Sequence, residues 1–285
     1  MEVKSVAVIG AGTMGNGIAQ VVAASGISVV MTDINDIGLK RGLDAIGKSL
    51  ERLVSKQKLD ARGKDALLAR IRTTTRMEDI ADCDVVVEAA TENVDLKLKI
   101  FADLDRIAKP AAILASNTSS ISLTRIAGTT KRPSQVIGMH FFNPVPVMPL
   151  VELIRALQTA DGTYQTIKAL TEKLGKTPVE VKNSPGFVGN RILLPMINEA
   201  VYCLHDGLAT ADDIDSVMKL GMGHPMGPLA LADLIGLDTC LAILRVLYEG
   251  FKDPKYRPCL LWQEKVDAGQ LGRKSGSGFF VYTKP

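Results

Sequence analysis

A glycine-rich segment near the N-terminus limits the fold of this chain more than any other feature. The apolar run 6–9 leads into Gly10-Ala11-Gly12-Thr13-Met14-Gly15, and a helical pattern over residues 16–24 follows at once. A GxGxxG pattern is weak evidence alone, but between a strand and a helix it is typical of a dinucleotide-binding loop. The first glycine permits a tight turn, the second lets the backbone approach a pyrophosphate at the helix N-terminus, and the third lets the helix pack on the strand. The residues expected to bind the dinucleotide are Gly10, Gly12, Thr13, Met14 and Gly15.

Asp33 indicates which dinucleotide fits this loop. It ends the next apolar run, Ser28–Thr32, about twenty residues further on, where a carboxylate accepts hydrogen bonds from an adenosine ribose. A carboxylate there also repels the extra phosphate of NADP, and neighbouring Ile34 and Asn35 supply no arginine to bind it. We therefore expect NAD as the cofactor.

The first 184 residues alternate short β-branched runs with helical stretches, which is typical of a mainly parallel α/β sheet of the Rossmann type. The clearest strands are Ser5–Ile9, Ser28–Thr32, 84–88, Ile113–Ser116 and 136–140. Runs 150–154 and 178–181 could extend the same sheet. The alternation stops near residues 183–186, and from Gly189 on the apolar residues recur at helical spacing. The sequence thus predicts an NAD-binding domain over residues 1–184 and an all-α domain over residues 185–285.

An insertion at about residues 36–70 breaks the alternation of strand and helix. The residues that recur there in steps of three or four, as in an amphipathic helix, are Leu39, Leu43, Ile46, Leu50 and Leu53. Residues 60–63 are predicted as a turn and residues 66–70 as a second helix, which makes a helical hairpin. Its basic side chains are Lys40, Arg41, Lys48, Arg52, Lys56 and Lys58. From the sequence pattern, a solvated basic face and a ligand-binding face are equally consistent with these charges.

Composition excludes several classes of protein. The net charge of +3, with 23% charged residues, is too small to argue for nucleic acid or an anionic membrane. No apolar run approaches the roughly 18 residues that cross a bilayer, and the N-terminus begins directly with a strand pattern and not a leader. The four cysteines, Cys83, Cys203, Cys240 and Cys259, form no CxxC pair, and no histidine lies at metal spacing. We expect free thiols, no metal site and a cytoplasmic location.

His140 is the favoured general base among the three histidines of the chain. Removal of hydride from an alcohol requires a base for the hydroxyl proton, and histidine suits this near neutral pH. His140 ends the predicted strand 136–140, and ligands of parallel sheets bind at the carboxyl ends of strands. His205 is expected at the end of a helix, and His224 in a tight glycine-containing loop.

Glu152 is the expected partner of this base. It lies twelve residues further on within the apolar run 150–154, where a carboxylate requires a partner if it is buried. The proline-rich segment 143–149 could fold the strand of Glu152 back beside His140, where an anion would orient the imidazole and stabilise its charged form. A structural ion pair with an arginine is the alternative.

Seven segments, in order along essentially the whole chain, resemble the 3-hydroxyacyl-CoA dehydrogenase family, most closely its short stand-alone bacterial members. They are GAGTMGNGIAQ, EAATENVDLKLKIF, ASNTSSISLTRIA, GMHFFNPVPVMPLVELI, NSPGFVGNRILLPMINEA, GMGHPMGPLALADLIGLD and GRKSGSGFFVY. The resemblance implies reversible oxidation of an (S)-3-hydroxyacyl-CoA with NAD, with 3-hydroxybutyryl-CoA and acetoacetyl-CoA as the expected pair, by an enzyme without a fused hydratase. Separately, the apolar helical surface of the predicted second domain suggests a homodimer, although these apolar helices could instead form that domain's own core.

The resemblance also implies residue roles. His140 would be the base and Glu152 its partner, Ser119 would bind the reacting oxygen, and Asn190 would complete that pocket from the second domain. The further NAD-binding residues implied are Glu92, Lys97, Asn117, Asn143 and Lys274, and the CoA-binding residues are Ser49 and Lys56. From the residues alone, the segment 117–120 could equally be a polar loop and Asn190 a helix cap. The chain departs from the family at Ser277 and Phe280, where lysine and tyrosine are common.

Two other functions are compatible with parts of the pattern. A lysine-dependent β-hydroxyacid dehydrogenase shares a Rossmann domain and a helical domain, but its base is a lysine where this chain has Asn190 and Arg191. A crystallin-like structural protein would bind dinucleotide without turnover. Retention of His140, Glu152 and Ser119 together with Asn190 argues against it.

Overall fold

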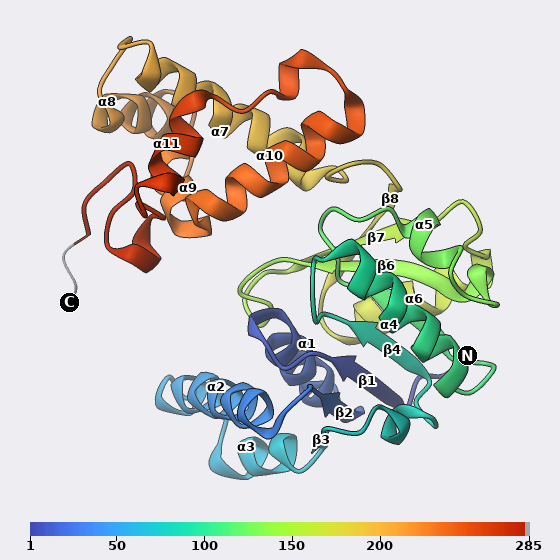
Figure 1. Cartoon of the computed structure of the whole chain (residues 1–285). Coiled ribbons are helices and arrows are strands. Elements are labelled where there is room, and N and C mark those ends of the chain that lie inside the picture. The colour runs from blue at the N-terminus through green and yellow to red at the C-terminus, as the bar shows by residue number, and fades with distance from the viewer. Residues whose placement is uncertain (283–285) are drawn as a thin grey trace. The chain divides into compact units, whose positions relative to one another are not determined.

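Figure 1 shows the computed structural model of the chain, which describes residues 1–282. Its contacts divide the chain into two compact units, Met1–Ser184 and Pro185–Pro285. Each unit has a hydrophobic core of its own, as expected for a folding domain. Helices and strands alternate in the first unit, and helices dominate the second, which confirms the predicted fold class.

The first unit contains an eight-stranded sheet in the order β3-β2-β1-β4-β5-β6-β7-β8. The strands are β1 (Ser5–Ile9), β2 (Ser28–Thr32), β3 (Ile71–Thr74), β4 (Val85–Glu88), β5 (Ile113–Ser116), β6 (Val136–Phe141), β7 (Leu150–Arg155) and β8 (Thr177–Lys182). All neighbouring strands are parallel except β6 and β7, which are antiparallel. The two later runs of the sequence therefore do extend the sheet.

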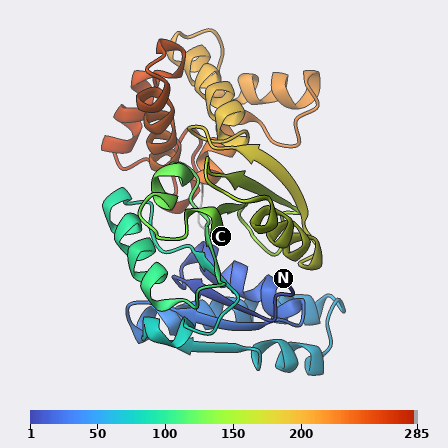
Figure 2. The same cartoon turned by 90° about the vertical axis from the view of Figure 1, so that its right-hand side faces the viewer.

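The strand order creates a place for a ligand at the end of β1. Strand β1 lies between β2 and β4, so the chain builds one half of the sheet outward through β2 and β3 and then returns to start the other half at β4. The connections after β1 and β4 therefore separate, and in such sheets the crevice at this switch point binds the ligand. Strands β1 and β4 are buried almost throughout, because helices cover a parallel sheet on both faces (Figure 2).

The helices of the first unit are α1 (Thr13–Ala24), α2 (Asp36–Ser55), α3 (Ala61–Leu68), α4 (Val94–Ile107), α5 (Leu123–Ala127) and α6 (Asp161–Lys173). Helices α2 and α3 form the hairpin. The apolar stripe of α2 is explained by burial of Leu39, Ile46 and Leu50 in the core of the first unit.

Two details of the sequence prediction are wrong. The second hairpin helix begins at Ala61 and not at residue 66, because the Asp60 side chain accepts a hydrogen bond from the Gly63 amide and caps the helix. Strand β3 was not predicted at all. It is an edge strand in which only Ile71 is buried, so it has no apolar run to identify it.

The second unit packs α7 (Gly189–His205), α8 (Ala211–Ser216), α9 (Pro228–Ile235), α10 (Leu237–Phe251) and α11 (Leu260–Asp267) around a second core. Trp262 is fully buried at its centre, and its indole donates to the Asn198 side-chain oxygen, 2.9 Å away. The C-terminal segment of the second unit is anchored by Asp233, which accepts hydrogen bonds from the amides of Phe279 and Phe280 and from the Tyr282 hydroxyl. Within residues 1–282 no helix is long and apolar enough to cross a membrane.

Candidate active site

The glycine loop joins β1 to α1 and has the geometry that each glycine requires. Gly10 has φ +97°, and a Cβ there would lie 2.7 Å from the Ala90 Cα. A Cβ on Gly15 would lie 1.8 Å from the Gly10 carbonyl oxygen, so only glycine lets the helix approach this closely. A Cβ on Gly12, in contrast, would meet no described atom within 4 Å. Gly12 is also the N-cap residue of α1, so open space lies in front of the uncapped helix amides, as a pyrophosphate requires.

Asp33 follows β2 directly and lies beside this loop. One of its carboxylate oxygens accepts the Ala11 amide at 2.8 Å, and the other accepts the Ile34 amide at 2.7 Å. The Gly10 amide in turn donates to the Thr32 carbonyl oxygen at 2.7 Å. The end of β2 and the glycine loop therefore form one hydrogen-bonded unit, with Asp33 half-buried at its rim.

His140 and Glu152 face each other across the antiparallel strands β6 and β7. The register pairs them directly, and His140 Nδ1 lies 2.8 Å from a Glu152 carboxylate oxygen. Both side chains are buried, at 7% and 2% exposure. Segment 143–149 makes the turn that returns the chain, and it brings His140 and Glu152 together as the sequence predicts. The Phe142 ring lies 4.8 Å from the imidazole.

A buried lysine supports the turn between these two strands. The Lys176 ammonium donates to the carbonyl oxygens of Val145 and Met148 at 2.6 and 2.7 Å. Burial lowers the pKa of this lysine. The turn also contacts the first helix, because a Cβ on Gly17 would lie 2.8 Å from the Val145 Cβ. Lys176 could not be identified from the sequence, since 28 and 31 residues separate it from its two acceptors.

Asn117 and Asn143, two of the residues assigned to NAD by resemblance, occupy different environments. Asn117 follows β5 and is buried, and its side-chain oxygen accepts the Phe141 amide at 2.9 Å. It thereby ties the end of β5 to the end of β6, next to His140. Asn143 is exposed at the start of the turn after β6.

Glu92 and Ser119 are brought together from the segments that follow β4 and β5. Glu92 Oε1 accepts the Ser119 amide at 2.8 Å and the Ser119 hydroxyl at 3.2 Å. The other oxygen accepts the buried Thr118 hydroxyl at 2.7 Å. Thr118 was not identified from the sequence; its hydroxyl also accepts the amides of Ser120 and Ile121 and so shapes the loop.

Lys97 lies in the first turn of α4 and is fully buried. Its ammonium forms an ion pair with Glu88, the last residue of β4, and lies 3.4 Å from the Ser116 hydroxyl. The sequence alone does not identify Glu88 and Ser116 as site residues. A carboxylate at the end of a buried strand was the available signal, but its partner is on a helix.

The residues assigned to CoA both lie on α2 or at its end. Ser49 is half-buried and Lys56 is the exposed C-cap residue. They are seven positions apart, so two helical turns place them on the same side of α2.

Two further residues assigned by resemblance belong to the second unit. Asn190 is half-buried in the first turn of α7, where Val188 is the cap residue. Lys274 pairs with Asp238, its ammonium lying 2.5 and 2.7 Å from the two carboxylate oxygens. His205 ends α7, as the sequence predicts. The residues at which the chain departs from the family motif remain structured, since Ser277 forms isolated bridges with Gly272 and Val281.

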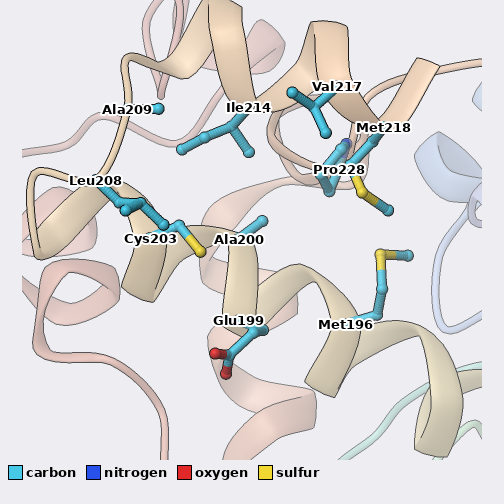
Figure 3. A pocket seen from close by; sticks show the side chains of 10 residues that line it. All are labelled: Met196, Glu199, Ala200, Cys203, Leu208, Ala209, Ile214, Val217, Met218 and Pro228. Carbon is cyan, nitrogen blue, oxygen red and sulfur yellow. The ribbon is translucent and has the colours of Figure 1, made fainter. Parts of the chain in front are cut away.

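A largely apolar cavity of about 550 Å³ lies in the second unit between α7, α8, α9 and the segment Val217–Gly221. Figure 3 shows its lining, which includes Met196, Cys203 and Ile214. Glu199 is the one lining residue with a charged side chain, and its carboxylate points away from Ile214. The cavity therefore offers apolar surface and no acid–base chemistry.

Comparison with known proteins agrees with this geometry. The model of the 3-hydroxyacyl-CoA dehydrogenase NAD binding domain matches residues 5–184, and that of the C-terminal domain of the same family matches residues 186–282. A probable 3-hydroxybutyryl-CoA dehydrogenase of Bacillus subtilis is 54% identical over 282 residues, covering 99% of this chain and 98% of its own length. The 3-hydroxybutyryl-CoA dehydrogenase of Bradyrhizobium diazoefficiens is 52% identical over 280 residues, covering 98% and 96%.

A solved structure gives the same result. The crystal structure of (S)-3-hydroxybutyryl-CoA dehydrogenase from Ralstonia eutropha matches with a TM-score of 0.96 and 56% identity, over 99% of this chain and 100% of that chain. Sequence identity and fold therefore agree along the whole length. With both of its domains matched in order and relatives more than half identical, this chain belongs to the NAD-dependent 3-hydroxyacyl-CoA dehydrogenase family.

Proposed function

We propose that this enzyme interconverts (S)-3-hydroxybutyryl-CoA and acetoacetyl-CoA, with His140 as the acid–base group. The observation that carries this proposal is the buried His140–Glu152 contact of 2.8 Å at the end of β6, in the unit that holds the glycine loop. The names of the relatives, 3-hydroxybutyryl-CoA dehydrogenases of high identity over the full chain, support the four-carbon acyl group.

The proton is assigned to a specific atom of His140. Nδ1 faces Glu152, so Nε2 is the nitrogen that takes the proton from the substrate hydroxyl in oxidation and returns it to the ketone oxygen in reduction. Glu152 fixes the orientation of the ring and stabilises the imidazolium while it exists. Bound NAD supplies the nicotinamide carbon that accepts or releases the hydride.

Ser119 and Asn190 orient the reacting oxygen in this proposal. The Ser119 hydroxyl donates to Glu92, so its lone pairs are directed to accept the hydrogen bond of a substrate hydroxyl. Asn190, in the first turn of α7, contributes a side-chain amide that can donate to the ketone oxygen.

Different residues are proposed to bind the nucleotide portions of NAD and of CoA. Open space at Gly12 and the amides at the start of α1 fit the pyrophosphate of NAD, and Asp33 fits its adenosine ribose. On α2, Ser49 and Lys56 provide a hydroxyl and an exposed cation for the CoA phosphates. Lys274 is proposed to reach NAD from the second unit, and Asn143 from the turn after β6.

Steady-state kinetics with a C4 to C16 series of 3-hydroxyacyl-CoA substrates tests the proposal. We expect NADH formation with the highest kcat/KM at C4, and no turnover of free 3-hydroxy acids, which a lysine-dependent enzyme would use. Absence of NADH formation with every acyl-CoA, by a protein that still binds NADH, would refute the proposed activity.

We also propose a homodimer formed through the second unit. Leu208, Val217, Leu220 and Met222 are exposed apolar side chains in the segments that precede and follow α8. Leu208 and Val217 also line the apolar cavity, and water contact with exposed apolar surface is unfavourable. Light scattering should give about twice the 30.6 kDa chain mass, and Leu220→Glu should shift it to one chain mass. A monomeric wild type would contradict this.

A cytoplasmic location is the remaining proposal. All four cysteines are free, and burial raises the pKa of Cys83 to about 11 and of Cys240 to about 12, which keeps both as thiols. Fractionation of the native host would test it, and recovery in a secreted fraction would contradict it.

A further inference from the structure

Two charged side chains meet in the interior of the first unit, and the mechanism above moves no proton through either. Glu88 is 0% exposed and Lys97 is 1% exposed, and they form an ion pair. The buried Ser116 hydroxyl donates to the same Glu88 oxygen at 3.0 Å. Desolvation makes a buried ion pair a poor source of stability compared with apolar residues of similar volume. The place of this pair, at the ends of β4 and β5, points to another role.

The Glu88 carboxylate organises the segment after β4. Its second oxygen accepts the amides of Ala90 and Thr91 at 2.9 and 3.4 Å. This segment is the surface on which the glycine loop turns, because a Cβ on Gly10 would lie 2.7 Å from the Ala90 Cα. Displacement of Glu88 would therefore move the backbone that supports the loop proposed to bind the pyrophosphate.

Ser116 extends the same network to the segment after β5. Its hydroxyl accepts the Thr118 amide at 3.2 Å, and the Thr118 hydroxyl donates to Glu92 at 2.7 Å. Asn117 then accepts the Phe141 amide next to His140. These hydrogen bonds, together with the backbone of residues 116–118, link the support of the glycine loop to the strand end that carries the base.

We infer that Glu88, Lys97 and Ser116 form a buried positioning unit for NAD, in which Lys97 acts on the cofactor through Glu88 and not by contact of its own. This rests on the proposed use of NAD at the glycine loop and deepens it. Lys97 neutralises the carboxylate and holds it in the rotamer that receives the amides of Ala90 and Thr91. With 1% exposure, the Lys97 side chain presents almost no surface to a ligand while it is in this ion pair.

NADH titration of three variants, followed by fluorescence, tests this role. Lys97→Met, Glu88→Gln and Ser116→Ala should each weaken NADH binding, the first two by about tenfold, or about 1.4 kcal/mol, and the third by several-fold. The double variant Glu88→Gln/Lys97→Met should lose much less than the product of the single losses, because the two residues act as one unit. With acetoacetyl-CoA, KM for NADH should rise more than kcat falls.

A half-buried ion pair at the other end of α4 provides the control. Arg132 lies 2.7 Å from the Asp105 carboxylate and also donates to the carbonyl oxygens of Asp105, Ala108 and Lys109. Eight residues separate Lys97 from Asp105, about 12 Å along the helix. Arg132→Met should lower Tm and leave the Kd for NADH unchanged. The positioning role is refuted if the loss of NADH affinity is proportional to the loss of Tm across all four variants, Arg132→Met included.

Direct contact between Lys97 and the cofactor predicts a different pattern. Glu88→Gln would then release the ammonium, so this variant and Ser116→Ala would bind NADH as tightly as wild type or more tightly, while Lys97→Met alone would bind weakly. That pattern overturns the inference. If Lys97→Met and Glu88→Gln do not fold, Ser116→Ala, which removes only one hydroxyl, distinguishes positioning from direct contact. A wild type that binds NADH but fails to reduce acetoacetyl-CoA refutes the proposed substrate, and the NADH titrations still decide the role of this unit.

Discussion

The first unit contains two buried acid–base pairs, and they are built differently. His140 and Glu152 join two neighbouring antiparallel strands, at directly paired positions. Glu88 and Lys97 join a strand end to the first turn of a helix. An imidazole gains and loses a proton near neutral pH, whereas an ammonium ordinarily keeps its charge. The first pair is therefore suited to transfer a proton, and the second to hold backbone in place.

The largest expected effect is on turnover, at the His140–Glu152 pair that we propose transfers the proton. His140→Gln should lower kcat by about 10²–10⁴-fold, the usual contribution of general acid–base catalysis. Glu152→Gln should lose nearly as much, because it removes the anion that stabilises the imidazolium. The double variant should lose far less than the product of the two, while NADH affinity is retained in all three. Stopped-flow and steady-state rates measure this. Multiplicative losses in the double variant would mean that the two residues act independently and not as a pair.

The next effect concerns recognition of the cofactor and should leave the chemistry intact. If Asp33 binds the adenosine ribose as proposed, its carboxylate would repel the extra phosphate of NADP, and kcat/KM should favour NAD(H) by at least about tenfold, or about 1.4 kcal/mol. Asp33→Asn should reduce the ratio of kcat/KM for NAD(H) to kcat/KM for NADP(H). Equal efficiency of the wild type with both cofactors would remove the ribose role from Asp33.

A smaller effect is expected on binding of the acyl-CoA, from a residue of the helical hairpin. Lys56→Ala should raise KM for acetoacetyl-CoA several-fold, because an exposed charge contributes about 0–1 kcal/mol. KM for NADH should not change. An acyl-pantetheine substrate lacks the nucleotide phosphates and should be insensitive; an equal loss with it would mean that Lys56 acts on the fold.

The smallest effect should come from an ion pair at the opposite, amino end of the sheet. Burial opposes ionisation of Asp84, but the Lys109 ammonium at 2.7 Å and the amides of Lys4 and Ser5 outweigh it and lower the pKa of this carboxyl. Its stabilising contribution is therefore fully present above the ordinary carboxyl pKa near 4 and is lost as the pH falls through the lower, folded value.

Asp84→Asn should accordingly lower Tm by a few degrees at pH 7 and progressively less at acidic pH, with kcat and NADH affinity unchanged. Thermal melts over a pH series measure this. A change in NADH affinity in this variant would show that ion pairs of the first unit influence the cofactor regardless of their position, and the contrast between the two buried pairs would fail.

The fold could be predicted from sequence where burial leaves a continuous apolar run. β1 and β2 begin and end at the predicted residues, since parallel strands are covered on both faces. β3 could not be predicted, because an edge strand with one buried residue has no such run. The start of α3 was misplaced because Asp60 suits a turn and a helix cap equally well.

The candidate site was accessible from the sequence only in part, for a similar reason. His140 follows from its place at a strand end, and Glu152 from its apolar neighbours, since a strand and its returning partner are close along the chain. The pairing of Glu88 with Lys97 is not visible in this way, because the helix and the strand end meet only in the folded unit. The support of the turn by Lys176 depends on equally distant contacts.

The double use of Asp33 constrains any redesign of cofactor preference. The carboxylate that we propose selects the ribose also accepts the Ala11 amide, so it supports the glycine loop in addition to its proposed role in specificity. A substitution that admits NADP, such as Asp33→Gly, would also leave that amide without its acceptor and loosen the turn. An engineer would have to supply a new acceptor in the same step, for example through a side chain at the neighbouring position. Ancestors that exchanged one cofactor for the other would have faced the same coupling, so a path through paired changes is more accessible than one through single substitutions.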